Sequence, residues 1–487
     1  MSIVPGAQVN INSVILGTVA VKISKLQIRD LAVMLIRRDP LLKKQILTIA
    51  GPAMGEMIMY MIIGVVDIAV VGRLGAAPLA AVSLGAEVFY ALVLFLESLA
   101  IGSNILVAQA KGANDPDKIR IYTAHTLIIA LLLGIIAQLV GLFYGPAFLG
   151  LFSVEPDVYA QALDYLRITF AIAPFALMLY MTNAVFRGLG RTDLPMIIAT
   201  IVNIVNVVGD IVLVYGLAGF PKMGVAGAAA ATAVAHVLGW VLALMVLFSL
   251  DQVRPQIRDF LSPKWQSFRD IFSLGIPNVV EQFFNITSHL ISIFLLVYLG
   301  TLQFATHQLA VNVESISYMP GLGITIAATT LVGQAIGARD PRSARRFAQG
   351  CIELGLITMG FFALIFALVP SWVASLFTND PEIITLAEIV IRIAALEQLT
   401  IAFSFVLSGV LKGSGNTRTP MFISTGFTWL FRIPMLYVLV RIWSVPLQYI
   451  WFLFVIDWLL RSLVYLVLYR RQHWLRPAYE DTSTDQE

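Results

Sequence analysis

Long apolar stretches dominate this chain, and short polar turns separate them. About 20 predominantly apolar residues in a helix are enough to cross the hydrocarbon core of a bilayer. Most of these stretches exceed that minimum, so they can cross at a tilt. The pattern predicts twelve transmembrane helices, at residues 46–71, 78–108, 121–145, 158–186, 194–217, 224–250, 271–298, 303–335, 347–370, 384–411, 419–440 and 446–469.

The composition favours lipid over water as the solvent of this chain. Of its 487 residues, 59% are hydrophobic and 13% are charged, whereas soluble proteins have about 25% charged residues. In lipid, the backbone polar groups must be satisfied within the chain, as they are in helices. We therefore expect an all-α integral membrane protein. Its net charge of +3 does not indicate a nucleic-acid partner, and its single cysteine, Cys351, excludes an intrachain disulfide.

The basic residues of the connecting segments lie almost entirely on one side of the predicted spans. With both termini on that side, it carries 25 Lys and Arg residues, and the opposite loops carry only Arg73, Lys222 and Arg441. Cytoplasmic loops are enriched in Lys and Arg. The distribution predicts a multi-pass protein of the plasma membrane with both termini in the cytoplasm, and we expect the bacterial inner membrane.

The two halves of the chain repeat each other at an offset of 225 residues. The segment 106–113 (LVAQAKGA) recurs at 331–338 (LVGQAIGA), and the same offset relates 187–192 to 412–417. Chance similarity between apolar helices does not keep one register across so many polar positions, so we infer a duplication. Six spans per half predict two pseudo-symmetric six-helix bundles with the solute path at their interface.

The repeat and the span pattern together divide the chain into five segments. The predicted segments are a partly interfacial cytoplasmic N-terminus (1–45), the first lobe (46–250), a cytoplasmic linker (251–270), the second lobe (271–470) and a cytoplasmic tail (471–487). Residues 31–47 mix apolar and basic side chains, which is typical of a segment at the membrane surface. A disordered basic leader is the alternative, and Met34 is an alternative translation start.

Ionisable side chains inside spans are costly unless they face a cavity or a partner. Asp164 and Arg167 are three residues apart in the fourth span, and Glu388 and Arg392 are four apart at the matching place in the tenth. Both spacings favour local ion pairs on a helix. We interpret these two pairs as structural.

The first half contains polar residues that the second half lacks. Asn203, Asn206 and Asp210 lie on one face of the fifth span, at positions i, i+3 and i+7, and Asp67 lies in the first span. Oxygen ligands of this kind suit a proton or a hard monovalent cation. We predict that the acids bind a coupling ion, with an interhelical hydrogen-bond network as the structural alternative. The matching positions of the second half are Thr428, Phe431, Met435 and Ser292.

The second half has acids of its own. Glu281, Glu314 and Glu397 are the unpaired ones, and His307 lies earlier on the helix of Glu314. We consider these four residues candidates for a substrate or second-ion site, with a packing network as the alternative. Pro320 in the eighth span predicts a kink, which is either a hinge or static.

The sequence shows no pattern typical of an enzyme or an ATPase. The GxxxxGK[ST] phosphate loop is absent, and so are HExxH, CxxC and GxSxG motifs. We therefore expect no catalytic activity, no cofactor, and no metal beyond a Na⁺ ion at the coupling site.

Several motifs resemble those of multidrug and toxic compound extrusion (MATE) transporters, nearest the DinF-like branch. The similarity covers roughly residues 45–470 and keeps its order in both halves. The motifs that carry it are Val66-Asp67-Ile68 with Val71-Gly72-Arg73-Leu74-Gly75, Gln109-Ala110-Lys111-Gly112, Phe186-Arg187-Gly188-Leu189-Gly190, and the stretch 307–334 with Met319-Pro320-Gly321.

This resemblance implies a MATE/MOP-type fold that exports organic, often cationic or amphiphilic, solutes by antiport with H⁺ or Na⁺. It also implies an ion site at Asp67, Asn206, Asp210 and Thr232, where the archaeal and DinF-like branch has Asp, Asn-xxx-Asp and Thr. Other branches use a Glu in the seventh span, which matches Glu281, and an Asp in the tenth span that has no counterpart here. The expected partners are a small-molecule solute and membrane lipid, and we expect the protein to act as a monomer.

Three alternatives make different demands on the sequence. A lipid-linked oligosaccharide flippase of the same superfamily needs a basic cavity for pyrophosphate, whereas the interior charges here are mainly acidic. A channel has little need of a duplicated two-lobe scaffold, and a membrane-embedded enzyme needs a catalytic cluster. The sequence leaves open the substrate, the choice between H⁺ and Na⁺, and the stoichiometry.

Overall fold

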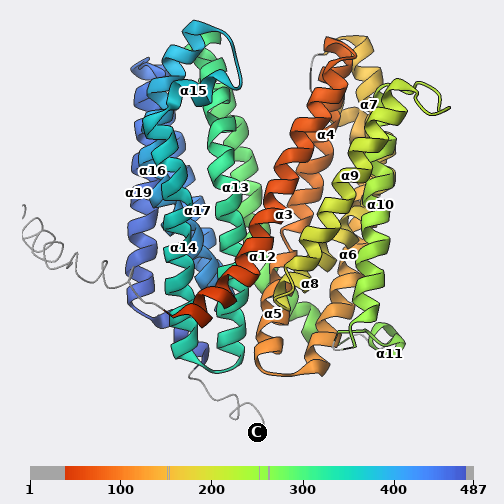
Figure 1. Cartoon of the computed structure of the whole chain (residues 1–487), viewed down its shortest axis with the longest axis vertical. Coiled ribbons are helices and arrows are strands. Elements are labelled where there is room, and N and C mark those ends of the chain that lie inside the picture. The colour runs from red at the N-terminus through yellow and green to blue at the C-terminus, as the bar shows by residue number, and fades with distance from the viewer. Residues whose placement is uncertain (1–38, 151, 153, 252, 262–263, 479–487) are drawn as a thin grey trace, which may run out of the picture.

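The computed structural model describes residues 39–150, 152, 154–251, 253–261 and 264–478, a part of the chain built from helices and turns without a strand. Short 3₁₀ turns cover Val297–Leu299 and His473–Ala478, and π-helical turns cover Thr428–Arg432 and Val438–Ile442. The α-helices, labelled as in Figure 1, are α3 (Pro40–Gly72), α4 (Ala76–Glu97), α5 (Ala100–Gly112), α6 (Pro116–Gly150), α7 (Pro156–Ala171), α8 (Ala173–Gly188), α9 (Asp193–Tyr215), α10 (Val225–Ser249), α11 (Ile257–Leu261), α12 (Trp265–Leu296), α13 (Thr301–Gly337), α14 (Pro341–Leu368), α15 (Pro370–Ser375), α16 (Pro381–Gly413), α17 (Arg418–Phe427), α18 (Ile433–Tyr437) and α19 (Leu447–Arg470).

The helices confirm an all-α membrane protein with the predicted number of spans. Within the described residues, eleven helical segments are long and apolar enough to cross a membrane. The bent pair α7 and α8 becomes a twelfth when it is counted as one span.

Two spans are less regular than their apolar patterns predict. In the fourth span, α7 and α8 meet at Ile172 with a bend of 55°. Pro174 lies in the first turn of α8, where it has no N–H group to donate to the preceding turn and its ring clashes with a carbonyl group of that turn. The eleventh span contains the two π-helical turns between and after α17 and α18. Apolar length identifies a span, but it does not locate such breaks.

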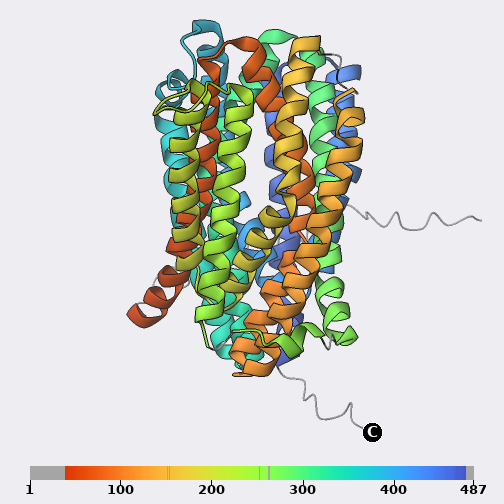
Figure 2. The same cartoon turned by 90° about the vertical axis from the view of Figure 1, so that its right-hand side faces the viewer.

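The spans form two groups that lie apart at one end of the molecule and converge at the other (Figure 1). One group contains α4 to α10, and the other contains α13, α14 and α16 to α19. The view turned by 90° shows the helices running in the same general direction, with α11 at the converging end (Figure 2). We call this the basic end, because it carries the basic turns between α5 and α6, α8 and α9, α13 and α14, and α16 and α17.

Two helices, α3 and α12, cross between the groups. The first part of α3, with Ile46 and Ala50, is buried in an apolar core of the second group, while Val71 near its end is buried in the first group. Helix α12 makes the opposite crossing, since Ile271 packs beside Leu99 of the first group and its later part packs on α17 and α18. The crossings bring polar residues of each half next to the other half.

Aspartates start two of the helices at the basic end. Asp39 precedes Pro40 of α3, and Asp340 precedes Pro341 of α14; each carboxylate accepts hydrogen bonds from two backbone N–H groups of the first turn. An acidic N-cap followed by proline is a favoured helix start, because the cap satisfies free N–H groups and proline has none to satisfy.

The two helical ion pairs predicted from spacing are confirmed. Asp164 and Arg167 approach to 3.8 Å, and Glu388 and Arg392 to 2.8 Å. All four side chains are partly exposed, which agrees with a structural interpretation on the helix surface.

Other local predictions are only partly covered by the structure. Helix α13 continues through Pro320 as one α-helix, and the hinge stays a prediction. The surface segment predicted at 31–47 lies outside the described residues as far as residue 38, and its last part belongs to α3. The predicted tail is described only to residue 478.

Candidate functional site

Four polar side chains from three helices meet inside the first group. Asp67 comes from α3, Asn206 and Asp210 from α9, and Thr232 from α10. With its amide nitrogen toward Asp67, Asn206 donates to Oδ1 at 3.0 Å, and its carbonyl oxygen accepts from Thr232 Oγ1 at 3.3 Å. This orientation satisfies both ends of the amide, which is how amide orientations are assigned. The structure therefore brings the four residues of the predicted ion site together.

The carboxyl groups of Asp67 and Asp210 lie within hydrogen-bonding reach of each other. Asp210 is only 1% exposed, and no other donor within the described residues reaches its two oxygens. Two neighbouring carboxylates repel each other, and a buried carboxylate without a hydrogen-bond donor also lacks compensation for the water it has lost. A proton shared between them, or a small cation bound to both, removes this cost.

The groups around this acid pair are neutral and polar. The phenols of Tyr90 and Tyr165 lie near both carboxyl groups, and Tyr165 is also close to Thr232. In the described part of the chain, no group of three His, Cys, Asp or Glu side chains is arranged to hold a metal ion. Carboxyl, amide and hydroxyl oxygens suit a proton or a Na⁺ ion.

Asn203, on the same face of α9 in the sequence pattern, has a different role. Its amide donates to the carbonyl oxygen of Met59 at 2.7 Å and so joins α9 to α3. The spacing i, i+3, i+7 places three polar groups on one helix face, but only Asn206 and Asp210 reach the cluster around Asp67.

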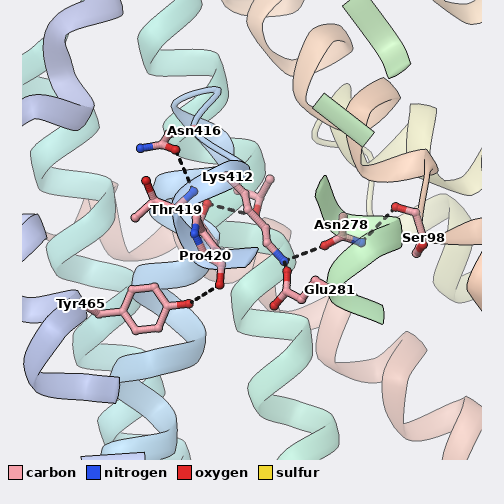
Figure 3. Close-up of polar contacts among 10 residues, drawn as sticks. Ser98, Asn278, Glu281, Lys412, Asn416, Thr419, Pro420 and Tyr465 are labelled. Carbon is pink, nitrogen blue, oxygen red and sulfur yellow. Dashed lines mark hydrogen bonds and ion pairs between the residues drawn. The ribbon is translucent and has the colours of Figure 1, made fainter. Parts of the chain in front are cut away.

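Glu281 forms an ion pair at the end of α16. Its carboxylate lies 3.0 Å from Lys412 Nζ, which also donates to Asn278 at 2.7 Å (Figure 3). The amide of Asn278 donates in turn to the carbonyl oxygen of Ser98 at 3.0 Å. These contacts connect α16 through α12 to the first half of the chain.

The same ion pair occurs 225 residues earlier. Arg187 at the end of α8 donates from Nε to Glu56 of α3 at 3.2 Å, and Glu56 is fully buried. The repeat matches both acids and both bases, yet spacing along a single helix does not predict that they pair. Their joint recurrence at one offset is the signal that identifies the pairing. The pairing assigns Glu281 a structural contact, and its role toward a substrate stays a prediction.

Glu314 and Glu397 meet inside the second group. The two carboxyl groups, from α13 and α16, lie within hydrogen-bonding reach of each other. Near them, Asp457 accepts from Arg432 at 2.8 Å and pairs with Arg461 at 2.9 Å. The i, i+4 spacing of Asp457 and Arg461 is the sequence signal for this second network.

His307 packs against aromatic rings. Its ring contacts Trp451 and Phe454, with centroids 5.7 and 6.2 Å away. Of the four second-half candidates, the structure therefore brings Glu314 and Glu397 together, whereas Glu281 pairs with a lysine and His307 packs against aromatic rings.

At the basic end, the two halves are joined by a pair of equivalent hydrogen bonds. The side chain of Gln109 in α5 donates to the carbonyl oxygen of Gly413 at 3.2 Å. The side chain of Gln334 in α13 donates to that of Gly188 at 3.0 Å. Donors and acceptors are both related by the offset of 225 residues, so the contact has the pseudo-symmetry of the repeat.

Glycines allow the backbones to approach at this contact. A Cβ atom on Gly112 would lie 1.8 Å from the carbonyl oxygen of Gln334, and one on Gly337 would lie 1.9 Å from that of Gln109. Both distances are shorter than any non-bonded contact tolerates, so these positions exclude a side chain while the basic end is closed.

Comparison with known sequences is in keeping with this architecture. The MatE family model matches residues 52–212 and 277–438, one match in each half. A probable multidrug resistance protein NorM of Thermotoga maritima is 29% identical over 90% of this chain and 94% of its own length. A probable NorM of Idiomarina loihiensis is 31% identical, over 82% of this chain and 87% of its own.

Solved structures share the fold. A MOP superfamily transporter from Pyrococcus furiosus superposes with a TM-score of 0.83 at 23% identity, over 92% of this chain and 99% of that one. A MATE family transporter in an outward-facing conformation gives the same TM-score, identity and coverage. With a family model that matches most of both halves, the chain belongs to the MatE family of transporters.

Proposed function

We propose that this protein is a secondary active multidrug exporter, which moves organic, often cationic or amphiphilic, solutes out of the cell in exchange for H⁺ or Na⁺. Its relatives include multidrug resistance proteins that match it along most of their length. The observation that supports the coupling role is the pair of Asp67 and Asp210, in which Asp210 is buried and Asp67 is half-buried beside neutral polar groups.

The acid pair gives the exporter two states. With a proton or Na⁺ bound, the pair loses its mutual repulsion; without it, the pair favours opening to water or to an incoming cation. Each elementary charge that moves inward releases about 2.3 kcal/mol per 100 mV. A tenfold solute gradient costs about 1.4 kcal/mol. At about 100 mV, one coupling ion is therefore enough to export a neutral solute against a tenfold gradient.

Alternating access uses the contact between the halves. We assign the basic end to the cytoplasm because Lys and Arg gather in its turns, with both termini on that side of the plasma membrane, in bacteria the inner membrane. The halves touch at this end through Gln109 and Gln334. Export then requires these contacts to break when the transporter opens inward, and one chain contains all the parts needed.

In this proposal the second half supplies residues for the solute or a second ion, whereas the first half binds the coupling ion. Glu281, His307, Glu314 and Glu397 are candidates for solute contact or for a second ion. We do not favour the flippase alternative, since the reported relatives are drug resistance proteins and the first-half cluster is acidic. An enzymatic activity and a cofactor have no role in this mechanism.

The proposal is tested by dye efflux from proteoliposomes under an imposed pH gradient and, separately, a Na⁺ gradient. Asp67→Asn and Asp210→Asn should each abolish uphill transport while the protein still folds and inserts. Asp164→Asn is the matched control, because this acid lies on the helix surface. Full uphill transport by both site variants would refute the coupling site, and dye accumulation without any ion gradient would refute antiport.

A further inference from the structure

The linker between the two halves contacts α6 at the basic end of the molecule. Asp259 of α11 is buried and lies 2.8 Å from Arg120 Nε, and its carboxylate also accepts from the backbone N–H of Gln256. The backbone N–H of Lys264 donates to His125 at 3.1 Å. These contacts, outside the ion site, hold the described parts of the linker in place against one helix.

The opposite side of the linker exposes large apolar side chains. Ile257, Leu261 and Trp265 are 79, 76 and 80% exposed, whereas Asp259 between the first two is 8% exposed. Ile257 and Leu261 are four residues apart on α11 and therefore share one face. An exposed apolar patch rimmed by polar residues marks a site of interaction with a protein or a membrane.

Basic side chains surround these apolar residues. Arg254, Arg258, Lys264 and Arg269 are all exposed. Helix α11 lies at the basic end of the molecule, next to α6 (Figure 1). Trp265 is the first residue of α12, which is itself a candidate span, so this residue lies where a span begins. Tryptophan is enriched at that level of a membrane.

We propose that the linker, residues 253–261 and 264–270, lies in the headgroup layer of the membrane and binds anionic phospholipids. Apolar side chains insert at the boundary with the acyl chains, and basic side chains next to them attract anionic headgroups. Because Asp259 ties α11 to Arg120, lipid bound here also holds the basic end of α6 at a fixed depth.

Nitroxide labels on the full-length protein test this proposal. Replacing Cys351 by Ala leaves no other cysteine, so Ile257→Cys and Leu261→Cys can be labelled singly in nanodiscs. Ala113→Cys, in an exposed polar turn at the same end, is the control. We expect labels at 257 and 261 to collide more often with oxygen than with an aqueous nickel chelate, and the label at 113 to show the reverse.

Lipid composition tests the headgroup. Nanodiscs of phosphatidylcholine with phosphatidylglycerol should protect the label at 261 from nickel several-fold better than phosphatidylcholine alone. Arg258→Gln with Lys264→Gln should remove that difference. Labels at 257 and 261 as accessible to nickel as the label at 113 would overturn the proposal, and equal protection in both lipids would overturn its anionic part. Protection that needs added cytosolic protein would indicate a protein partner instead.

Discussion

Gln109 and Gln334 occupy equivalent positions in the two halves, and each donates its side-chain amide to a backbone carbonyl of the other half. Because Gly112 and Gly337 bring the two backbones together at the same place, separation of the halves there breaks both hydrogen bonds. These contacts therefore belong to the conformation in which the basic end is closed.

Removing both glutamine side chains should destabilise the closed basic end. A hydrogen bond contributes about 1 kcal/mol net, so Gln109→Ala with Gln334→Ala should shift the equilibrium by about 2 kcal/mol, up to roughly 30-fold. The measurement is the distance between spin labels at Ala113→Cys and Ala338→Cys in the Cys351→Ala background. We expect a larger population of long distances.

Gln138→Ala is the control for this pair. Its amide donates to the carbonyl oxygen of Ala171 at 2.9 Å, a bond within the first half, so its removal should leave the distance distribution unchanged. An unchanged distribution in the double variant would show that the glutamines do not stabilise the closed end.

Asn206 tests the ion site, and Asn203, on the same helix face but outside the cluster, is its matched control. Asn206→Ala removes a side chain that hydrogen-bonds to both Asp67 and Thr232, so the ion concentration needed for half-maximal efflux should rise several-fold. Asn203→Ala removes a bond to Met59 and should cost about 1 kcal/mol of stability with little change in ion dependence. Efflux at several pH values and Na⁺ concentrations checks both, and equal ion dependence in the two variants would contradict the site.

The ion site was accessible to prediction because its members are marked locally. Asn206 and Asp210 share a helix face through their spacing, and Asp67 is an acid in an apolar segment without a cationic neighbour. Their resemblance to one family then connects three helices that spacing alone leaves separate. The transmembrane helices can likewise be predicted from the length of each apolar stretch, because that length depends only on contiguous residues.

Contacts between distant segments were not accessible in this way. Glu56 and Arg187 are 131 residues apart, and their pairing depends on how α3 crosses between the groups. The bend at Ile172 depends on Pro174 within a predominantly apolar stretch. Arg432 contacts Asp457 from another helical segment, so spacing along the chain does not predict this pair. Arg461, the other partner of Asp457, lies one turn away on the same helix, and its i, i+4 spacing predicts the pair.

Asp340 provides a pH-dependent test of helix capping at the basic end. Hydrogen bonds from Ser343 and from backbone N–H groups lower the pKa of this carboxyl below its ordinary value of 3.8. The charged Asp340 carboxylate therefore stabilises the folded protein fully above pH 3.8, and this stabilisation is lost as the pH falls through the lower pKa of the folded state. Asp340→Ala should cost about 0.5–2 kcal/mol at neutral pH.

Thermal unfolding in detergent across a pH series measures this effect. The difference in unfolding temperature between Asp340→Ala and the parent protein should become smaller below pH 3.8. Asp251→Ala changes an acid in an exposed turn and should unfold at the same temperature as the parent at every pH. A difference that widens as the pH falls would contradict the capping role.

The two repeated ion pairs differ in burial, which predicts different costs of breaking them. Glu56 is fully buried, so Glu56→Gln leaves Arg187 charged and unpaired in the interior and should cost about 3–5 kcal/mol. Glu281 and Lys412 are each 13% exposed, and Lys412 keeps Asn278 as a partner, so Glu281→Gln should cost less. Thermal unfolding should show a larger loss of stability for Glu56→Gln than for Glu281→Gln, and adding Arg187→Gln to Glu56→Gln should restore part of the lost stability.

Equal losses of stability in the two single variants would contradict the difference in burial. A stable Glu281→Gln protein that no longer exports solute would place Glu281 in the substrate site.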